Sequence, residues 1–226
     1  MQTNKIPVIA IDGPSASGKG TVAQLVARKL GFHYLDSGAL YRLVALKTIQ
    51  LHADTQNPGA AAEIAIHLNV FFKDEHIYLD DIIVTDAIRT EQCGIVASQL
   101  AAYPQVRAAL TERQRAFRQL PGLVADGRDM GSVIFPDAVL KIYLTASAEV
   151  RAQRRHKQLI EKGMSANIAD LLQDIQKRDE RDSNRSIAPL QQGIDAKLLD
   201  TTSLTISQAQ DAVLSWYNDV LAKTRV

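Results

Sequence analysis

The feature that most restricts how this chain can fold is a glycine-containing segment between a strand-like run and a helix-like repeat. The stretch VIAIDGPSASGKGTVAQLV covers residues 8–26, and its part 13–19 fits the pattern G-x-x-x-x-G-K. Glycines allow backbone N–H groups to curve around an anion, and the following helix directs its positive end at the same point. Lys19 adds a full charge that can reach the outer phosphates of a nucleotide. The segment therefore predicts a phosphate-binding loop.

One position in the loop departs from the usual pattern. The residue after the lysine is ordinarily Ser or Thr, whose hydroxyl holds Mg²⁺. Here that position is Gly20, and Thr21 follows it. Two arrangements stay open for the ion. It is held largely through water and phosphates, or it is held directly by Ser17 or Thr21.

The rest of the chain alternates short apolar strands with amphipathic helices, which predicts an α/β fold with a parallel sheet covered by helices on both faces. We expect a P-loop NTPase-like, three-layer fold with a five-stranded core sheet. Its strands are expected at 6–11, 32–37, within 120–129, at 138–144 and at 197–201. Ligands of such sheets bind beyond the carboxyl ends of the strands, where Asp12, Asp36 and Asp126 are expected.

Helical periodicity and capping residues predict the remaining elements. Helices are expected at 20–30, 38–51, 90–102, 104–119, 148–162 and 167–181, and a final helix is expected after residue 205. Ser37 is the expected cap of the second helix, and Thr205 with Gln208 resembles a capping box. Residues 56–59 are expected to form a turn. The stretch 68–85 mixes short apolar runs with acidic residues and predicts two or three short antiparallel strands.

Composition narrows the class of protein. Hydrophobic residues make up 46% of the 226-residue chain, enough for a sizeable core. The 26 basic and 25 acidic residues give a net charge of +1, which argues against a sequence-wide nucleic-acid surface. The single cysteine, Cys93, excludes an internal disulfide and a thiolate metal cluster. With neither a secretory signal nor an apolar stretch of membrane-spanning length, a cytoplasmic protein is expected.

Several classes of protein use a phosphate-binding loop. A GTP switch needs a guanine-reading N-K-x-D motif, but the only Asn–Lys pair is Asn4–Lys5, before the first strand. A nucleic-acid motor needs a larger chain or a basic track. A small kinase needs a second anion site, and arginines recur where loops should face the ligand. They are Arg42, Arg89, Arg128, Arg154, Arg155, Arg178, Arg181 and Arg185.

The arginine pattern favours a kinase whose acceptor is itself a phosphate. Guanidinium groups bind phosphate oxygens bidentately, whereas each arginine taken singly is ordinarily a solvated surface residue. A phosphate acceptor with a second pKa of about 6 is largely dianionic at neutral pH and needs no general base. No Ser-His-Asp or paired-carboxylate constellation is evident, which agrees with a phosphate acceptor better than with a sugar hydroxyl.

Nearly the whole chain resembles the bacterial cytidylate kinases, of the nucleoside-monophosphate kinase family. The resemblance is carried by IDGPSASGKGT, LDSGALYR, IRTEQCGIVASQLAAYPQVR, RQRAFRQLPGLVADGRDMGSVIFPDA and KRDERDSNRSIAPL. It implies a core domain of residues 1–62, 86–150 and 166–226, an acceptor-binding insert of residues 63–85 and a lid of residues 151–165.

The resemblance also implies site residues. In that family a Ser, an Arg and an Asp read cytosine, and the matching positions here are Ser98, Arg107 and Asp129. A carboxylate accepts from the exocyclic amine of cytosine while a guanidinium donates to the ring acceptors. Uracil would present lone pairs to that carboxylate. The alternative interpretation is that Asp129 only pairs with a neighbouring arginine.

The remaining implied roles complete the expected site. The donor ATP is expected on Gly13, Pro14, Ser15, Ala16, Ser17, Gly18, Lys19, Gly20 and Thr21, with Arg154 and Arg155 closing over its phosphates. The acceptor is expected at Ser37, Tyr41, Arg42, Ser98, Arg107, Arg128, Asp129, Arg178, Asp182 and Arg185. The groups acting on the transferred phosphoryl are expected to be Lys19, Arg128, Arg155, Arg178 and Arg185.

The expected function is therefore ATP-dependent phosphorylation of CMP, and of dCMP, with Mg²⁺ and by in-line transfer. We expect a monomer with no nucleic-acid or membrane partner. Two alternatives stay open: a kinase for another nucleotide or a small metabolite on the same core, and an ATP-binding regulatory module.

Overall fold

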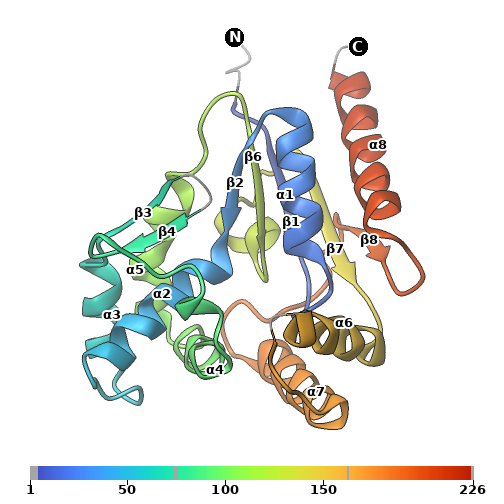
Figure 1. Cartoon of the computed structure of the whole chain (residues 1–226). Coiled ribbons are helices and arrows are strands. Elements are labelled where there is room, and N and C mark those ends of the chain that lie inside the picture. Colours follow the sequence, from blue (N-terminus) through green and yellow to red (C-terminus); the bar gives the residue numbers. More distant parts are fainter. Residues whose placement is uncertain (1–4, 74–75, 162, 225–226) are drawn as a thin grey trace. The chain divides into compact units, whose positions relative to one another are not determined.

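A computed structural model describes residues 5–73, 76–161 and 163–224 of the chain. The fold divides into two compact units, the first formed by residues 1–35 and 117–226 and the second by residues 36–116. Both units are α/β in character, and Figure 1 shows their elements in chain order. The two units are described separately below.

The first unit is built on a five-stranded sheet with the strand order β2-β6-β1-β7-β8. Neighbouring strands run parallel in the pairs β1–β6, β1–β7 and β7–β8. The strands are β1 (Val8–Asp12), β2 (His33–Asp36), β6 (Leu123–Gly127), β7 (Leu140–Thr145) and β8 (Lys197–Asp200). The five predicted core strands are confirmed, and the three strands that carry Asp12, Asp36 and Asp126 are neighbours, as expected from the sequence.

Four helices accompany this sheet. They are α1 (Lys19–Leu30), α6 (Ala148–Glu161), α7 (Ile168–Asn184) and α8 (Ile206–Thr224). Helices α1 and α8 pack together and cover one face of the sheet (Figure 1). Side chains of β1 and β7 such as Ile9, Ile11 and Ile142 are almost completely buried against Val26 of α1 and Val213 of α8. This apolar layer fixes the start of α1, and with it the loop that precedes the helix.

Every residue of β1 is buried, which agrees with the uninterrupted apolar run in the sequence. The short π-helical segment η2 (Met130–Ile134) lies against β1 and β6. Helices α6 and α7 pack against each other and follow the carboxyl end of β7 (Figure 1). The predicted capping box is confirmed, since Gln208 N–H donates to Thr205 Oγ1 and Thr205 N–H donates to Gln208 Oε1.

The second unit consists of helices and a small antiparallel sheet. Its helices are α2 (Ser37–Gln50), α3 (Pro58–Ile66), the 3₁₀ segment η1 (Ala87–Arg89), α4 (Glu91–Leu100) and α5 (Pro104–Arg115). Its sheet pairs β3 (Val70–Lys73), β4 (His76–Leu79) and β5 (Ile82–Ile83) in antiparallel order. The prediction of two or three short antiparallel strands is confirmed, with three strands present, although residues 74 and 75 of that stretch lie outside the described residues.

Two local predictions were wrong. The cap of α2 is Asp36, whose carboxylate accepts from Ala39 N–H at 2.9 Å, and Ser37 is instead the first helical residue. The expected turn at 56–59 is the start of helix α3, with Asn57 as its cap and Pro58 in the first turn. The segment η2, for which the sequence analysis gave no prediction, forms because its N–H groups find a buried acceptor in Asp12.

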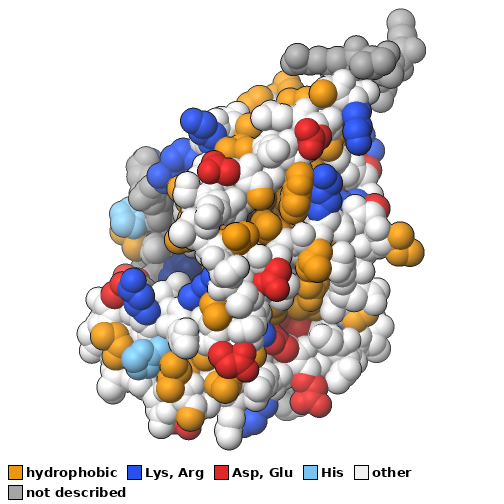
Figure 2. Space-filling model, turned by 90° about the vertical axis from the view of Figure 1, so that its right-hand side faces the viewer, with side chains coloured by type: hydrophobic (Ala, Val, Ile, Leu, Met, Phe, Trp, Pro, Cys, Tyr) orange, Lys and Arg blue, Asp and Glu red, His pale blue; other side chains and the backbone are white. Residues whose placement is uncertain are grey.

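The surface agrees with the balanced composition. On the face drawn in Figure 2, lysine and arginine side chains alternate with aspartate and glutamate side chains. Within the described ranges, no helix is both long and apolar enough to cross a bilayer.

Candidate functional site

The loop between β1 and α1 has the backbone that an anion cradle requires. Gly18 caps α1 in the left-handed region, with φ 92°, and Ala16 is also left-handed, with φ 57°. A Cβ added to Gly13 would lie 1.9 Å from the carbonyl oxygen of Leu144, so only glycine fits there. Turns that alternate handedness in this way point successive N–H groups inward. The loop therefore has the backbone conformation that the predicted phosphate-binding role requires.

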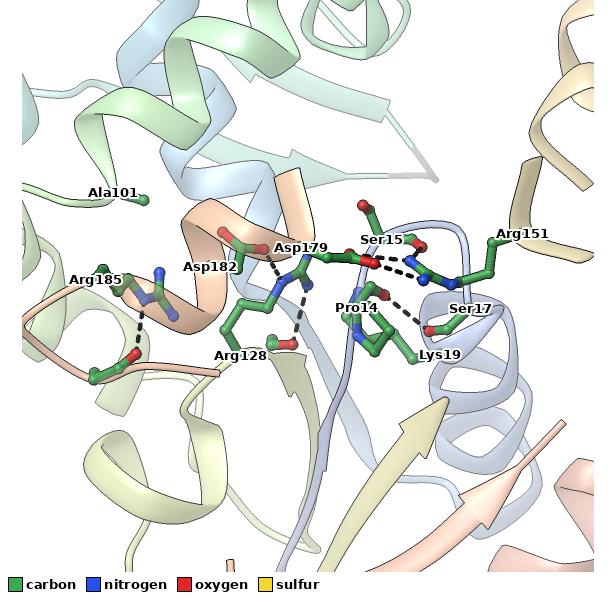
Figure 3. A network of polar contacts seen from close by, with 12 residues as sticks. Pro14, Ser15, Ser17, Lys19, Ala101, Arg128, Arg151, Asp179, Asp182 and Arg185 are labelled. Atoms are coloured by element: carbon green, nitrogen blue, oxygen red, sulfur yellow. Dashed lines mark hydrogen bonds and ion pairs between the residues drawn. The ribbon is translucent and has the colours of Figure 1, made fainter. Parts of the chain in front are cut away.

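The side chains of the loop gather around one carbonyl oxygen. Lys19 Nζ donates to Pro14 O at 3.3 Å, and Ser17 Oγ donates to the same oxygen at 2.9 Å (Figure 3). Ser17 is buried and Lys19 is half-buried. The ammonium group thus lies over the mouth of the loop, at the start of α1, where a phosphate would also meet the positive end of the helix.

The position after the lysine is occupied by glycine for a steric reason. A Cβ on Gly20 would lie 3.1 Å from Asp126 Oδ2 and 3.5 Å from the Tyr34 hydroxyl. The Asp126 carboxylate, at the end of β6, therefore stands beside the place where a Ser or Thr hydroxyl would be. Oxygen ligands of this kind suit Mg²⁺. The sequence placed Asp126 at this end of the sheet but did not identify it as a neighbour of Gly20.

The residues predicted to hold the metal have different surroundings. The Ser17 hydroxyl is engaged by Pro14 O, and Thr21 is exposed at the first turn of α1. In the part of the chain that the structure describes, no three His, Cys, Asp or Glu residues form a preassembled metal cluster. The donor set of Ser17, Thr21 and Asp126 fits a magnesium ion that keeps much of its water and bridges phosphates, as this ion ordinarily does.

A buried ion pair surrounded by arginines lies in the same unit. Arg128 Nε contacts Asp182 Oδ2 at 2.7 Å, and the two side chains are 16% and 7% exposed. Although burial opposes it, the charge of Arg128 holds the pKa of Asp182 below its ordinary value, with further contributions from Arg178 and Arg185. One carboxylate is thus faced by three guanidinium groups. Guanidinium groups bind phosphate oxygens well, so this cluster suits an anionic ligand such as a phosphate.

The Arg128 guanidinium is itself fixed from several sides. Burial acts against its charge, but Asp182, Asp126 and Asp12 together raise its pKa above the ordinary value. Its Nη1 also donates to Gly127 O at 3.2 Å, and Arg185 Nε donates to Ala188 O at 2.7 Å (Figure 3). These arginines are oriented before any ligand arrives, which reduces the entropy lost on binding.

Asp12, the last residue of β1, acts as a clamp for the segment after β6. Its two carboxylate oxygens accept from Met130 N–H and Gly131 N–H, each at 2.8 Å. Burial raises the pKa of Asp12 from 3.8 to about 6, although these two N–H groups favour the ionised form. The clamp links the residue that precedes the phosphate-binding loop to the segment that carries Arg128 and Asp129.

The raised pKa of Asp12 predicts a pH dependence of stability. Because the folded protein binds this proton more tightly than the unfolded chain, the contribution of Asp12 to stability is full below pH 3.8 and is lost as pH rises to about 6. We expect the difference in unfolding free energy between the wild-type protein and Asp12→Asn to change by about 2 kcal/mol between pH 4 and pH 6.5. Urea unfolding at both pH values measures it, and a constant difference would contradict the prediction.

Two arginines of α6 contact carbonyl oxygens of the phosphate-binding loop. Arg151 Nη1 donates to Ser15 O at 3.3 Å, and Arg154 Nη1 donates to Ser17 O at 3.0 Å. Arg154 also contacts Thr201, and burial lowers its pKa although Asp200 acts in the opposite direction. Arg155, on the same helix, is half-buried.

The second unit contains the other predicted acceptor residues. Arg42 Nη1 donates to Ile88 O at 2.7 Å and to Thr90 O at 3.2 Å, so its guanidinium lies over the start of α4. Gly94 provides the space, because a Cβ there would lie 2.8 Å from Arg42 Nη2. Arg107 Nη1 donates to Ala101 O at 3.3 Å. The buried or nearly buried members of this set are Ser37, Tyr41, Ser98 and Arg107.

Comparison with known proteins decides among the phosphate-binding classes. A sequence model of the cytidylate kinase family matches residues 9–219. The cytidylate kinase of Polynucleobacter asymbioticus is 62% identical over 217 residues, which are 96% of this chain and 99% of that protein. The cytidylate kinase of Nitrosomonas europaea is 59% identical over 217 residues, which are 96% of this chain and 97% of that protein. This chain belongs to the cytidylate kinase family.

Membership of the cytidylate kinase family confirms the resemblance drawn from the sequence motifs. It makes the chain a member of a phosphotransferase family, as predicted. Among solved structures, an uncharacterized protein from Eubacterium ventriosum ATCC 27560 is similar in fold, with a TM-score of 0.51 at 12% identity over 94% of this chain and 98% of that one. At that identity the similarity concerns the fold alone.

The structure adds residues that the sequence analysis of this cytidylate kinase family member did not single out. Asp12 was noted only for its place at a strand end, and Arg151 with its partner Asp179 was not assigned a role. All three make short polar contacts with the segments that carry predicted site residues. Their signal in the sequence is weak, because each is a common charged residue whose partner lies far away along the chain.

Proposed function

We propose that this protein catalyses the transfer of the γ-phosphoryl group of ATP to CMP, and to dCMP, giving CDP and dCDP. The observation that carries the proposal is a formed phosphate-binding loop in the same unit as a cluster of three arginines around one buried aspartate, in a chain of the cytidylate kinase family. Phosphoryl transfer depends mainly on positioning and on charge neutralisation, and these two features supply both.

The donor side of the reaction is assigned to the loop. The backbone N–H groups of residues 13–19 cradle the phosphates of ATP, and Lys19 leaves Pro14 O to contact the outer phosphate oxygens. Arg155 joins them from α6, together with Arg154 after it leaves Ser17 O. These cations stabilise the charge on the transferred group and on the leaving oxygen in the transition state.

Mg²⁺ is the proposed metal, with Ser17, Thr21 and Asp126 as the residues that would hold it, directly or through water. When bound, the ion would supply positive charge to the oxygens of the donor phosphates. The protein residues named above would position the nucleotide.

The acceptor phosphate is assigned to the arginines. Arg128, Arg178 and Arg185 provide guanidinium groups around Asp182, which orients them and keeps part of their charge balanced. Ser37, Tyr41 and Arg42 are the proposed ligands from the second unit. The acceptor needs no catalytic base, because a phosphate monoester is largely dianionic at neutral pH. The arginines therefore place an already reactive oxygen in line with the donor.

The base is proposed to be read by Ser98, Arg107 and Asp129. Asp129 is 3% exposed and directly precedes η2, so its position depends on the Asp12 clamp. A carboxylate accepts from the amine of cytosine and repels the carbonyl of uracil. Stranding a buried polar group in this way is the physical basis proposed for discrimination between CMP and UMP.

The remaining assignments concern organisation. We propose that residues 63–85 form the acceptor-binding insert and residues 151–165 the lid, attached to a core of residues 1–62, 86–150 and 166–226. Lid closure would exclude water, which would otherwise compete as the acceptor. The enzyme is proposed to act as a monomer in the cytoplasm, without nucleic-acid or membrane partners. Sedimentation of the purified protein tests the monomer directly.

Gly94 offers a test of the acceptor assignment from the second unit. Gly94→Ala is expected to displace the Arg42 guanidinium from Ile88 O and Thr90 O, because the new Cβ would lie 2.8 Å from Nη2. Loss of one oriented phosphate ligand should raise the KM for CMP about tenfold and leave the KM for ATP unchanged. The matched control is Gly59→Ala in α3, which should change neither value. Equal KM values for CMP in both variants would remove Arg42 from the acceptor site.

The function itself is tested by ATP consumption with a panel of acceptors. The purified protein is incubated with ATP, Mg²⁺ and, in turn, CMP, dCMP, UMP, AMP and GMP, and ADP formation is followed with a coupled assay. We expect CMP and dCMP to give the highest kcat/KM. A higher value for any of the other three nucleotides would contradict the proposed substrate.

A further inference from the structure

Helices α6 and α7 have few apolar anchors. Within the described residues of α7 only Ile175 and Asp182 are buried, and within those of α6 only Arg151 and Ala152 are buried. A helix normally holds its position through an apolar face several residues wide. Leu171 and Leu172 of α7 are only half-buried, as are Val150 and Leu159 of α6, so the apolar contacts of both helices are partial. Polar contacts therefore contribute to where the two helices lie. The position matters, because α7 carries Arg178 and Asp182.

The polar contacts of α6 converge on Arg151. Its guanidinium makes a bidentate pair with Asp179 of α7, at 2.5 and 3.0 Å, and the Arg151 side chain is 6% exposed. Its Nη1 also donates to Ser15 O of the phosphate-binding loop (Figure 3). Its Nε donates to Ala146 O after β7. One side chain therefore joins α6, α7, the end of β7 and the loop.

Asp179 stands between the two acceptor-side residues of α7. Arg178 is its neighbour in sequence, and Asp182 lies three residues further on, about one turn away on the helix surface. Asp182 in turn holds Arg128 at 2.7 Å. Helix α7 is thus linked through Asp179 and Arg151 to the phosphate-binding loop, and through Asp182 to Arg128.

We propose that Arg151 is a positioning residue that, through its bidentate pair with Asp179 and its bond to Ser15 O, sets the distance between the phosphate-binding loop and the arginines of α7. Arg151 touches no reacting group in this role. Lysine cannot replace it, because an ammonium group lacks the planar fork that binds a carboxylate and a carbonyl together. This inference rests on the proposed function only for its kinetic consequence, which is a loss of alignment between donor and acceptor.

The kinetic test is the variant Arg151→Met, with Arg151→Lys beside it. Misplacement by about 1 Å costs on the order of 100-fold in rate, so kcat for CMP should fall between about 10- and 100-fold in both variants. The separate dissociation constants for CMP and for a non-hydrolysable ATP analogue should stay within about threefold of the wild-type values. The reason is that the substitution removes no proposed ligand from the ATP site or from the CMP site. Asp179→Leu should give the same pattern, and the double variant should be no slower than the slower single variant.

The matched control is Arg118→Met. Arg118 is also a largely buried arginine of the first unit, paired with Asp137 at 2.8 Å and with Ile6 O, and it contacts no predicted site residue in these bonds. It should lower the unfolding midpoint as Arg151→Met does, but leave kcat within about threefold. A decrease in kcat of the same size in Arg118→Met would show that general destabilisation accounts for the effect.

A second readout does not depend on the reaction. Amide hydrogen exchange over residues 168–184 should become at least about tenfold faster in Arg151→Met than in the wild-type protein or Arg118→Met, since α7 loses its tie to the loop. Unchanged exchange in α7, unchanged kcat, or loss of both binding affinities together with kcat would each overturn the positioning role. Absence of CMP turnover in the wild-type protein would instead count against the proposed function, and the exchange measurement would still decide the role of Arg151.

Discussion

Lys19→Met is expected to lower kcat for CMP phosphorylation about 1,000-fold while the protein remains folded. The ammonium group of Lys19 donates to Pro14 O at 3.3 Å, and in the proposed mechanism it becomes a ligand of the outer phosphates of ATP. Removing one preorganised charge at a transferring phosphoryl group typically costs two to three orders of magnitude in rate. The methionine side chain has nearly the same length, so packing at the start of α1 is preserved.

The effect is measured by single-turnover transfer from ATP to CMP, with circular dichroism to verify the fold. Lys29→Met is the matched control, because Lys29 is an exposed lysine in the last turn of the same helix. It should leave kcat unchanged within about twofold. Near-normal turnover in Lys19→Met would remove the loop lysine from the mechanism.

Asp129→Asn is expected to change which base the enzyme accepts. An ionised carboxylate can only accept hydrogen bonds, which suits the amine of cytosine. An amide can donate to the carbonyl of uracil instead. We expect the ratio of kcat/KM for CMP to that for UMP to fall about 100-fold in Asp129→Asn, and to fall by a similar factor in Asp129→Ala through loss of CMP binding alone.

The two variants separate base recognition from a structural role. Only Asp129→Asn should raise the absolute kcat/KM for UMP, because only asparagine offers the new donor. Asp195→Asn is the control, since Asp195 pairs with Lys141 at the surface and should not affect the ratio. If the ratio stays unchanged in both Asp129 variants, Asp129 serves only as a partner for neighbouring arginines.

The strongest predictions from the sequence concern segments where the local residue preferences and the packing of the fold favour the same residue types. Residues 13–19 lie between a buried strand and a helix, and their glycines and Lys19 fit a phosphate-binding loop, which is why this loop was predicted. The capping box of Thr205 and Gln208 is likewise a local device, and it forms as expected. The five core strands were predicted because burial on both faces forces continuous apolar runs.

The missed elements are those whose signal is small or non-local. Helix α3 buries Ala61 and Ala65, so its apolar face is marked only by alanines and shows little periodicity. The sequence signal for this helix was Asn57 as a cap followed by Pro58 in the first turn. Segment η2 forms because Asp12, more than 100 residues earlier, accepts its N–H groups, and no local pattern records that partner.

The same reasoning explains the outcome at the candidate site. The motifs identified the arginines of KRDERDSNR, and the structure shows that Arg178 and Arg185 act on Asp182, which pairs with Arg128. Arg151 and Asp179 were not distinguished from other surface charges, since only the fold shows that this pair is largely buried against Ser15. Sequence patterns thus selected the candidate residues, whereas the contacts that hold those residues in place required the structure.

The most direct measurement of the central claim is a crystal structure with CMP and a non-hydrolysable ATP analogue bound together. The account predicts the triphosphate on the N–H groups of residues 13–19 with Lys19 on its outer oxygens, and the phosphate of CMP on Arg128 with its base amine at Asp129. A structure in which CMP contacts neither Arg128 nor Asp129, or in which the triphosphate lies away from the loop, would contradict it.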